Sequence, residues 1–465
     1  MKQRPNILLI VMDATRFDYL SAYGYPCENT PNLDRLAQDG ILFERAFASA
    51  PWTPPSHASL FTGTYPSRHG VDVNENLFLN EENRTIAEIL SENGYRTFGV
   101  LPDAHLSSDR GFHKGFQEYL ELWRIPYLYP EYDWNDCLMR NLLFGRDKRT
   151  YYTNRVIQRW LRVNWRGTDP FFIFLNYKTA HNQYQPPRAF KRRFEITPGP
   201  GVDMRKVKYY SRAGGYPYMA RRFEMTEEEL AILKSWYVGA IAYMDFRLGE
   251  LIQSLKEAGA YENTLIIVTA DHGENFGEHH LAYHMFCLYE SLIHVPLIMS
   301  WPAGLPHGRG VPGLVSLTDV VPTLVDLLRL EGAGDDIQGT SLVPFDGRQY
   351  HDHVFAEFGR PHYMLKRLQT RFPGDDFSLF DKGLRCIRTE QFKLIVGSDG
   401  TEEFYDLATD PGEICNLSGA QPKAAAELRE NLAEWGYSTE NFTSNGKEPQ
   451  ENESVRRSLE KLGYF

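Results

Sequence analysis

The sequence predicts an α/β protein in which helices flank a central, largely parallel sheet, with a smaller C-terminal α+β domain after it. Short apolar runs alternate with helical patterns over the first 330 residues, which is typical of strands joined by crossover helices. The runs are continuously apolar, so both faces of the sheet should be covered. At 465 residues, 42% of them hydrophobic, the chain can bury a large core.

The expected strands, in chain order, are residues 6–12, 97–101, 171–177, 264–269 and 295–300. A helix is expected over residues 30–40, where Thr30 can cap and Pro31 suits the first helical position. A longer helix is expected over residues 225–259, and Thr226 with Glu229 can form a capping box at its start.

The alternation of strands and helices suggests how the chain divides. Residues 1–345 are expected to form the main domain, and residues 346–465, with short strand candidates and a polar helical tail, a C-terminal subdomain. Two segments break the pattern, at about 120–165 and 188–222, and both are rich in aromatic and basic residues. Such insertions usually lie over a site. Solvated excursions or contacts within a homo-oligomer are the alternatives.

Composition excludes several classes of function. The 50 Lys and Arg against 61 Asp and Glu give a net charge of -11, which argues against a nucleic-acid partner. The five cysteines are widely spaced without a CxxC pair, so neither a disulfide framework nor a cysteine zinc site is expected. We expect a cytoplasmic protein, and no apolar stretch is long enough for an integral membrane span.

Polar residues that suit a metal ion follow two of the expected strands. Asp13 ends the first strand, and Asp271 and His272 directly follow the run 264–269 and Ala270. Ligand sites in sheets of this kind form at the carboxyl ends of strands. Two carboxylates and an imidazole meeting there have the donor atoms for a divalent cation. Asp-His-Gly by itself would be an ordinary strand-ending turn.

A third element supplies a hydroxyl. Residues 53–63 combine prolines with a small and apolar run that ends at Gly63, which predicts a short helix starting at about Thr53. A hydroxyl at that point lies at the positive end of the helix dipole, and as a metal ligand it could ionise. His57, one turn further on, can face the same pocket. Without the neighbouring metal-binding pattern, Thr53 would be an ordinary cap.

The segments 53–63 and 65–70 resemble the signature of the sulfatase family, within the alkaline phosphatase superfamily. Further blocks of the same family follow its order over nearly the whole chain: residues 5–13, 30–37, 263–274, 277–279, 295–298, 319–324 and 404–417. The resemblance implies an alkaline-phosphatase-like sulfatase fold and hydrolysis of a sulfate or phosphate ester.

The family signature is Cys or Ser, any residue, Pro, any residue, Arg, and its first residue is oxidised to formylglycine. This chain has Thr53 at the first position, Pro55 at the proline and His57 at the arginine. Oxidation of threonine would give a ketone rather than the aldehyde. Ser49-Ala50-Pro51 imitates the motif but lies out of register and lacks the arginine. The resemblance therefore favours a variant without formylglycine.

Further departures point in the same direction. Ala14 stands where the family has a second aspartate, Asp103 or a neighbour replaces a lysine, and His284 replaces another lysine. His105 is a weaker site candidate. The remaining set is similar to the single-metal site of threonine-dependent phosphotransferases of the superfamily. On that model one divalent cation, Mn²⁺ or Ca²⁺ with Zn²⁺ or Mg²⁺ as alternatives, is held by Asp13, Thr53, Asp271 and His272.

The same resemblance suggests catalytic roles. Thr53 would be the nucleophile, His181 would protonate the leaving oxygen, and His284 and His57 would donate to the anionic oxygens. Because the cation is offset by two carboxylates, singly charged sulfate esters, phosphodiesters and phosphonate esters are favoured, on a sugar or another extended molecule. The alternatives are a phosphoryl-group transferase in glycan or lipid modification and a non-catalytic binding protein.

Overall fold

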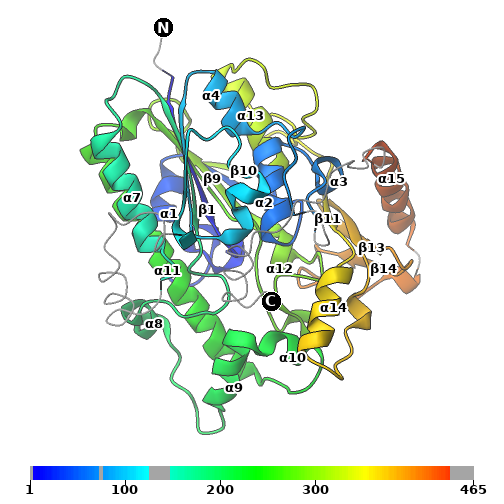
Figure 1. Ribbon diagram of the computed structural model, residues 1–465. Helices are drawn as coiled ribbons and strands as arrows, with labels where there is room; N and C mark the ends of the chain where they lie inside the picture. The colour runs from blue at the N-terminus through cyan, green and yellow to red at the C-terminus, as the bar shows by residue number, and fades with distance from the viewer. Residues whose placement is uncertain (1–3, 73–76, 125–146, 421, 440–465) are drawn as a thin grey trace.

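The computed structural model describes residues 4–72, 77–124, 147–420 and 422–439, and its centre is an eight-stranded sheet (Figure 1). The strands are β1 (Asn6–Met12), β2 (Ile41–Phe47), β3 (Arg96–Leu101), β4 (Glu118–Glu121), β5 (Phe171–Tyr177), β6 (Thr264–Thr269), β9 (His294–Ser300) and β10 (Arg309–Ser316). They follow the order β10-β2-β9-β6-β1-β5-β3-β4. All five expected strands are present, so the predicted α/β class is confirmed.

One of the expected strands is antiparallel to both of its neighbours. β9 pairs antiparallel with both β6 and β2, whereas β1, β5, β6, β3 and β4 pair in parallel. The connection from β6 to β9 holds only β7 (Asn275–Phe276), a 3-10 turn, β8 (Ala282–Tyr283) and α12 (Glu290–Ile293). A parallel return would require a crossover of a dozen or more residues along the sheet, usually a helix. This connection instead stays at the carboxyl end of β6, and there it builds part of the site.

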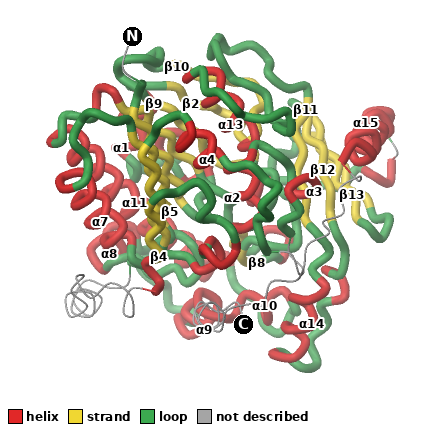
Figure 2. The backbone as a smooth tube through the Cα atoms, turned by 45° about the horizontal axis from the view of Figure 1, so that its top comes forward, coloured by secondary structure: helices red, strands yellow, loops and turns green. Residues whose placement is uncertain are grey.

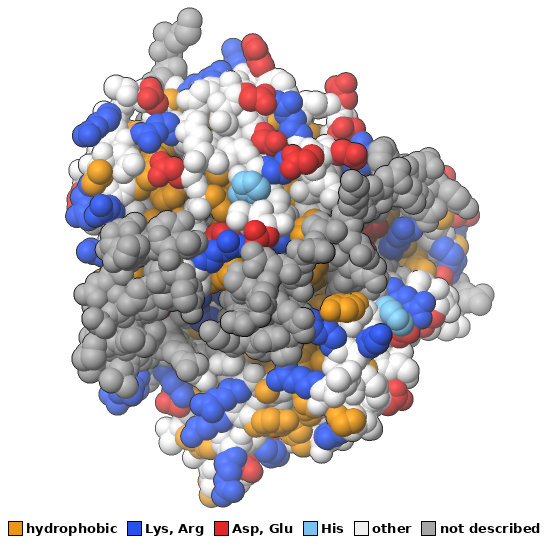
Figure 3. All heavy atoms as spheres, viewed as in Figure 1, with side chains coloured by type: hydrophobic (Ala, Val, Ile, Leu, Met, Phe, Trp, Pro, Cys, Tyr) orange, Lys and Arg blue, Asp and Glu red, His pale blue; other side chains and the backbone are white. Residues whose placement is uncertain are grey.

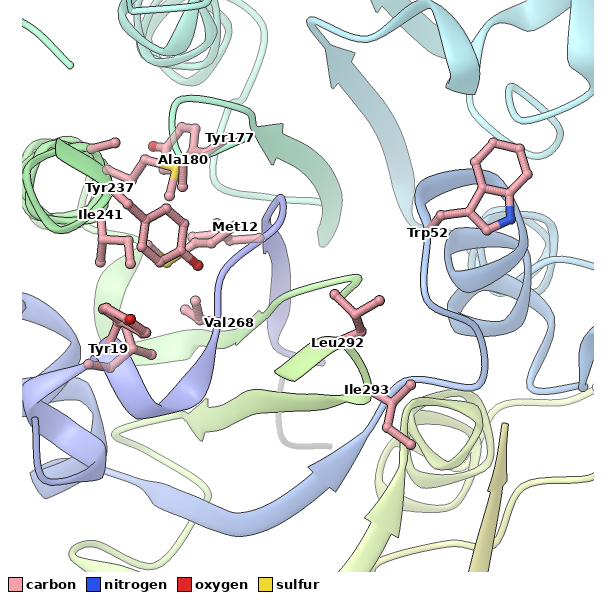
Figure 4. Close-up of a cluster of buried hydrophobic side chains, with 14 of the residues drawn as sticks. Met12, Tyr19, Trp52, Tyr177, Ala180, Tyr237, Ile241, Val268, Leu292 and Ile293 are labelled. Atoms are coloured by element: carbon pink, nitrogen blue, oxygen red, sulfur yellow. The ribbon is translucent and has the colours of Figure 1, made fainter. Parts of the chain in front are cut away.

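The central strand β1 is buried on both faces, as its continuous apolar sequence predicts. Leu8, Ile10 and Met12 face a core covered by α1 (Pro31–Gln38), α7 (Thr150–Val163) and α11 (Glu227–Glu257). The alternate residues of β1 face a second core covered by α2 (Thr53–Thr62), α4 (Ile86–Glu92) and α13 (Val320–Leu328). Figure 4 shows Tyr237 of α11 lying close to Met12.

The two helix starts were predicted with different success. At the start of α11, Thr226 and Glu229 form the expected capping box. Thr30 occupies the cap position of α1, but its side chain does not cap the helix. The Thr30 hydroxyl instead accepts a hydrogen bond from the Ser21 backbone N–H at 3.0 Å. Tertiary contact therefore redirects this hydroxyl.

The two segments that break the sequence pattern contain regular elements. Part of the first, residues 125–146, lies outside the described residues, and the remainder includes α7, a helix that packs on α11 and the sheet. The second contains α8 (Arg188–Phe194), α9 (Met204–Tyr209), a π-helical turn and α10 (Gly215–Met219). The domain boundary near residue 345 stays a prediction.

A second, antiparallel sheet follows in the chain, with the order β11 (His353–Phe358), β12 (Leu384–Thr389), β13 (Phe392–Gly397) and β14 (Glu402–Asp406). The helix α14 (His362–Arg371) connects its first two strands, and α15 (Lys423–Thr439) lies beside it (Figure 2). The Glu357 backbone N–H donates to the Ser49 carbonyl at 2.8 Å, which joins this sheet to the segment before α2. Among the described residues, no helix combines the length and apolar character needed to cross a membrane.

Candidate active site

Three adjacent central strands bring the predicted metal ligands together. Because Met12 of β1 is paired with Tyr177 of β5, and Val11 with Thr269 of β6, the residues after these strands meet at one edge of the sheet. Asp13 and Asp271 lie there with no exposed surface. The structure thus assembles the carboxylates that the sequence placed at the ends of two separate strands.

The donor atoms of Asp13, Asp271 and His272 all lie within 4.8 Å of one another. Asp13 Oδ1 and Asp271 Oδ2 are buried and accept no hydrogen bond from any residue that the structure describes. Buried carboxylate oxygens without donors are unfavourable unless a cation binds them. Two hard oxygens and one imidazole nitrogen therefore fit a divalent metal ion.

His272 is oriented as a metal ligand. Its Nδ1 lies 2.8 Å from the Gly273 carbonyl, so this nitrogen donates and Nε2 keeps its lone pair. His272 Nε2 lies 3.4 Å from Asp271 Oδ2 and 3.9 Å from Asp13 Oδ1. Burial lowers the pKa of His272 to about 4. The ring is therefore neutral at neutral pH, as metal binding requires.

The two carboxylates differ in their electrostatic surroundings. Burial and the charge of Asp271 raise the pKa of Asp13 well above its ordinary value. Burial alone would also raise the pKa of Asp271, but His272 and His57 lower it. Asp271 Oδ1 further accepts the Ala14 N–H at 3.2 Å, and Ala14 has a left-handed φ of 57°. The residue that replaces a family aspartate thus holds a ligand in place through its backbone.

Thr53 is the first residue of α2, as predicted, and its Oγ1 lies 3.2 Å from His272 Nε2. All ten residues of this helix are buried, and Gly63 ends it in the left-handed conformation. The Thr53 hydroxyl thus lies at the positive end of the helix and against the metal-ligand cluster.

His57 lies behind the carboxylates. Its Nδ1 donates to the Thr53 carbonyl at 2.9 Å and lies 3.5 Å from Asp271 Oδ2. Its ring packs edge-on against Phe61 and Phe174 in the core. Asn176, at the end of β5, donates to Asp13 Oδ2 at 3.4 Å and lies 3.3 Å from His57 Nε2. These contacts give His57 and Asn176 the role of holding Thr53 and both carboxylates in position.

The other two predicted histidines lie beside the metal-ligand cluster. The ring of His284 stacks on His272 at 4.4 Å, and the His181 ring lies 4.5 Å from His284. His284 Nδ1 lies 3.0 Å from Glu274 Oε1, and burial lowers the pKa of His284 to about 3. Glu274, whose pKa burial raises to about 8, is a site residue that sequence reasoning missed.

Two lysines near these histidines were also missed. Lys178 forms a buried ion pair with Asp103, and Asp103 Oδ1 lies 3.2 Å from His105 Nδ1. Lys148 donates to the His181 and Asn182 carbonyls. Burial and the charge of Lys178 lower the pKa of Lys148 to about 7. For Lys178 the available signal was its position, because a charged residue directly after a central strand lies at the site edge of the sheet.

Known proteins similar to this chain share its fold over most of its length. A family model described as Sulfatase matches residues 5–330, and one described as N-sulphoglucosamine sulphohydrolase, C-terminal, matches residues 277–436. The chain is 25% identical to an arylsulfatase of Clostridium perfringens, over 90% of this chain and 91% of that protein. It is 26% identical to arylsulfatase K of Bos taurus, over 92% and 81% respectively.

Solved structures are also similar to this chain over nearly its whole length. The chain superimposes on the phosphonate monoester hydrolase of Agrobacterium radiobacter with a TM-score of 0.74 and 27% identity, over 94% of this chain and 95% of the other. It also matches a protein solved in complex with its substrate D-glucosamine-2-N,6-O-disulfate, with a TM-score of 0.71 and 21% identity, over 97% and 100% respectively.

Proposed function

The chain belongs to the sulfatase family, and we propose that it hydrolyses a singly charged sulfate, phosphonate or phosphodiester ester with Thr53 as the nucleophile. Sulfatase and phosphonate monoester hydrolase relatives are ester hydrolases, and that reaction class holds for this chain. The observation that carries the proposal is the Thr53 hydroxyl, which lies at the N-terminus of α2 and 3.2 Å from His272 Nε2.

Asp13, Asp271, His272 and Thr53 would hold one divalent cation, Mn²⁺ or Ca²⁺. Sulfatases generally bind a divalent metal ion. The two carboxylate oxygens of this site that accept no hydrogen bond from a described residue suit such an ion. When bound, such an ion lowers the pKa of a neighbouring hydroxyl and polarises an ester oxygen. Mn²⁺ accepts both imidazole and carboxylate ligands.

The reaction runs in two displacements. Thr53 loses its hydroxyl proton to solvent, and its Oγ1 attacks sulfur or phosphorus in line. The bond from that atom to the alcohol oxygen breaks, and the alcohol leaves with a proton from His181. Water then attacks the Thr53 ester and breaks its bond to Oγ1, which restores the hydroxyl. The sum is ester plus water giving acid plus alcohol.

His181 can act as an acid only after it is protonated. Its Nδ1 lies 2.8 Å from the Asn182 carbonyl and donates to it, so in the neutral ring Nε2 carries the lone pair. Burial and the charge of Lys178 hold the pKa of His181 well below its usual range. A bound anionic ester opposes both effects and favours the imidazolium. The general acid therefore forms in the substrate complex rather than in the free protein.

The charges of the site favour a singly charged ester. The two positive charges of a bound cation would match Asp13 and Asp271, and Lys178 is matched by Asp103. With these charges matched, each further negative charge on the substrate is costly to bury, so a monoanion is favoured over a dianion. Phosphate monoesters, which are largely dianions, should therefore be poorer substrates than sulfate esters or phosphodiesters.

The test combines mass spectrometry of the purified protein with assays on an aryl sulfate, an aryl phosphonate monoester and an aryl phosphodiester. We expect an unmodified Thr53 and a loss of kcat on the order of 10⁴-fold or more in Thr53→Ala. Thr62→Ala, the same change at the opposite end of α2, is the matched control and should keep its activity. An aldehyde at Ser49 or Ser56, together with an active Thr53→Ala variant, would overturn the proposal.

A further inference from the structure

The segment after His181 lines a cavity that the proposed reaction does not use. This cavity, of about 210 Å³, lies between α8, α9 with the turn that follows it, and α11. Three cationic side chains line it, Lys191, Lys208 and Arg212, and none of its lining residues is acidic. We call this cavity the basic pocket. Figure 3 shows Lys and Arg gathered over the lower part of the molecule, where α9 and α10 lie.

The three cations are not equally neutralised. Lys191 Nζ lies 3.5 Å from Glu195 Oε1 and 3.7 Å from the centre of the Trp236 ring, so local contacts hold it in place. Lys208 and Arg212 make no ion pair with a carboxylate anywhere in residues 4–72, 77–124, 147–420 and 422–439. Several like charges around one small cavity favour an anion within it.

Hydrogen bonds join the wall of the basic pocket to both loops that carry the site histidines. Ser211, a lining residue, accepts the Tyr184 backbone N–H through its Oγ at 3.1 Å. The hydroxyl of Tyr283, the residue before His284, donates to the Tyr210 carbonyl at 3.0 Å. The pocket is therefore built onto the same segments as the proposed acid and its neighbour.

The pocket also lies within reach of the reacting centre along the chain. Gln185 lines it and is four residues after His181. Four residues span at most about 14 Å when fully extended. A short chain of sugar units covers such a distance, whereas a small aryl ester does not.

We propose that the basic pocket binds a second sulfate or phosphate group of an extended, sugar-like substrate whose reacting ester lies at Thr53. This inference rests on the proposed function, and it specifies the substrate class as multiply anionic. Lys208 and Arg212 supply charges that no carboxylate in the described part of the chain neutralises, and Arg212 can donate two parallel hydrogen bonds to one anionic group.

The test compares a disaccharide that carries two sulfate groups with an aryl sulfate that carries one. In Lys208→Gln/Arg212→Gln, we expect KM for the disulfated sugar to rise about tenfold. We expect kcat/KM for the aryl sulfate to stay unchanged. The matched control is Arg162→Gln/Arg192→Gln, which removes the same charge from two arginines that are exposed, as Lys208 and Arg212 are, but lie outside the pocket.

Binding separates failure of this inference from failure of the proposed function. Calorimetry of the disulfated sugar with Thr53→Ala should show a Kd that Lys208→Gln/Arg212→Gln weakens by the same factor of about ten. If neither ester is hydrolysed, the proposed function fails. The calorimetric comparison still tests whether Lys208 and Arg212 contribute to binding of the disulfated sugar. If the pocket variant and the surface control behave alike toward the disulfated sugar, the inference is overturned.

Discussion

Lys178, directly after β5, and Asp103, after β3, form an ion pair that is buried at the edge of the candidate site. Burial alone would raise the pKa of Asp103, but the Lys178 ammonium holds it well below its ordinary value. The chain thus has an aspartate near the place where the family has a lysine, and a lysine after the neighbouring strand neutralises that aspartate. The pair carries no net charge, and a position-by-position reading of the sequence does not reveal it.

Breaking this pair should be destabilising, whereas removing both charges should not. We expect Lys178→Met to lower the free energy of unfolding by about 3 kcal/mol or more, because it leaves the Asp103 carboxylate buried without its partner. Lys178→Met/Asp103→Asn should recover most of that loss in denaturant titrations. If the Lys178 ammonium also contacts the bound ester, kcat/KM for an aryl sulfate should stay low in the double variant even though its stability is restored.

The effect of His181 should depend on the leaving group. His181→Ala should slow hydrolysis of a sugar or alkyl ester by about 10²-fold or more, because the poorly acidic alcohol needs a proton as it leaves. An aryl ester, whose phenolate leaves readily, should be slowed much less. The measurement is kcat for a series of esters with alcohols of increasing acidity. An equal loss across the series would exclude His181 as the acid.

Metal binding should reverse the effect of Asp13→Asn on stability. With a chelator present, the variant should be at least as stable as the parent, because it removes one of two buried carboxylates that repel each other. With Mn²⁺ at about a hundred times its Kd, the parent should gain about 2.7 kcal/mol and the variant much less. Thermal unfolding with and without Mn²⁺ measures both. A parent protein that Mn²⁺, Ca²⁺ and Zn²⁺ all fail to stabilise would contradict the assigned metal site.

A pair outside the candidate metal cluster should make stability depend on pH. His351 Nε2 lies 2.8 Å from Asp319 Oδ2. Burial lowers the pKa of His351, but the hydrogen bond and charge of Asp319 outweigh it, so the pKa is raised. A group with a raised folded pKa stabilises fully below its unfolded pKa, about 6.5, and loses that contribution as pH rises through the folded value. His351→Gln should therefore destabilise more at pH 5.5 than at pH 9, by urea titration.

A loss of stability in His351→Gln that is the same at both pH values would mean that packing, rather than the charge of His351, supports the contact with Asp319. Asp352→Asn removes the next acid in the chain, whose charge contributes less than that of Asp319 to the raised pKa of His351, and should therefore reduce the pH dependence only slightly.

The sequence by itself determined the class of the fold and the candidate residues for a metal site. Strand β1 is apolar at every position from Ile7 to Met12, and only a strand covered on both faces requires that pattern. Asp13 and Asp271 were predictable because the carboxyl ends of neighbouring strands meet at one edge of a sheet. Thr53 was predictable because prolines before a small, apolar run mark the start of a helix.

Only the tertiary structure decided which partners those residues have. The antiparallel course of β9, the pairing of Lys178 with Asp103 and the position of His57 behind Asp271 all depend on contacts between segments far apart in the chain. The basic pocket likewise combines residues of α8, α9 and α11. Local sequence determines periodicity and helix ends because those depend on neighbouring residues, whereas buried charges are matched in space, where only the packed chain brings their partners together.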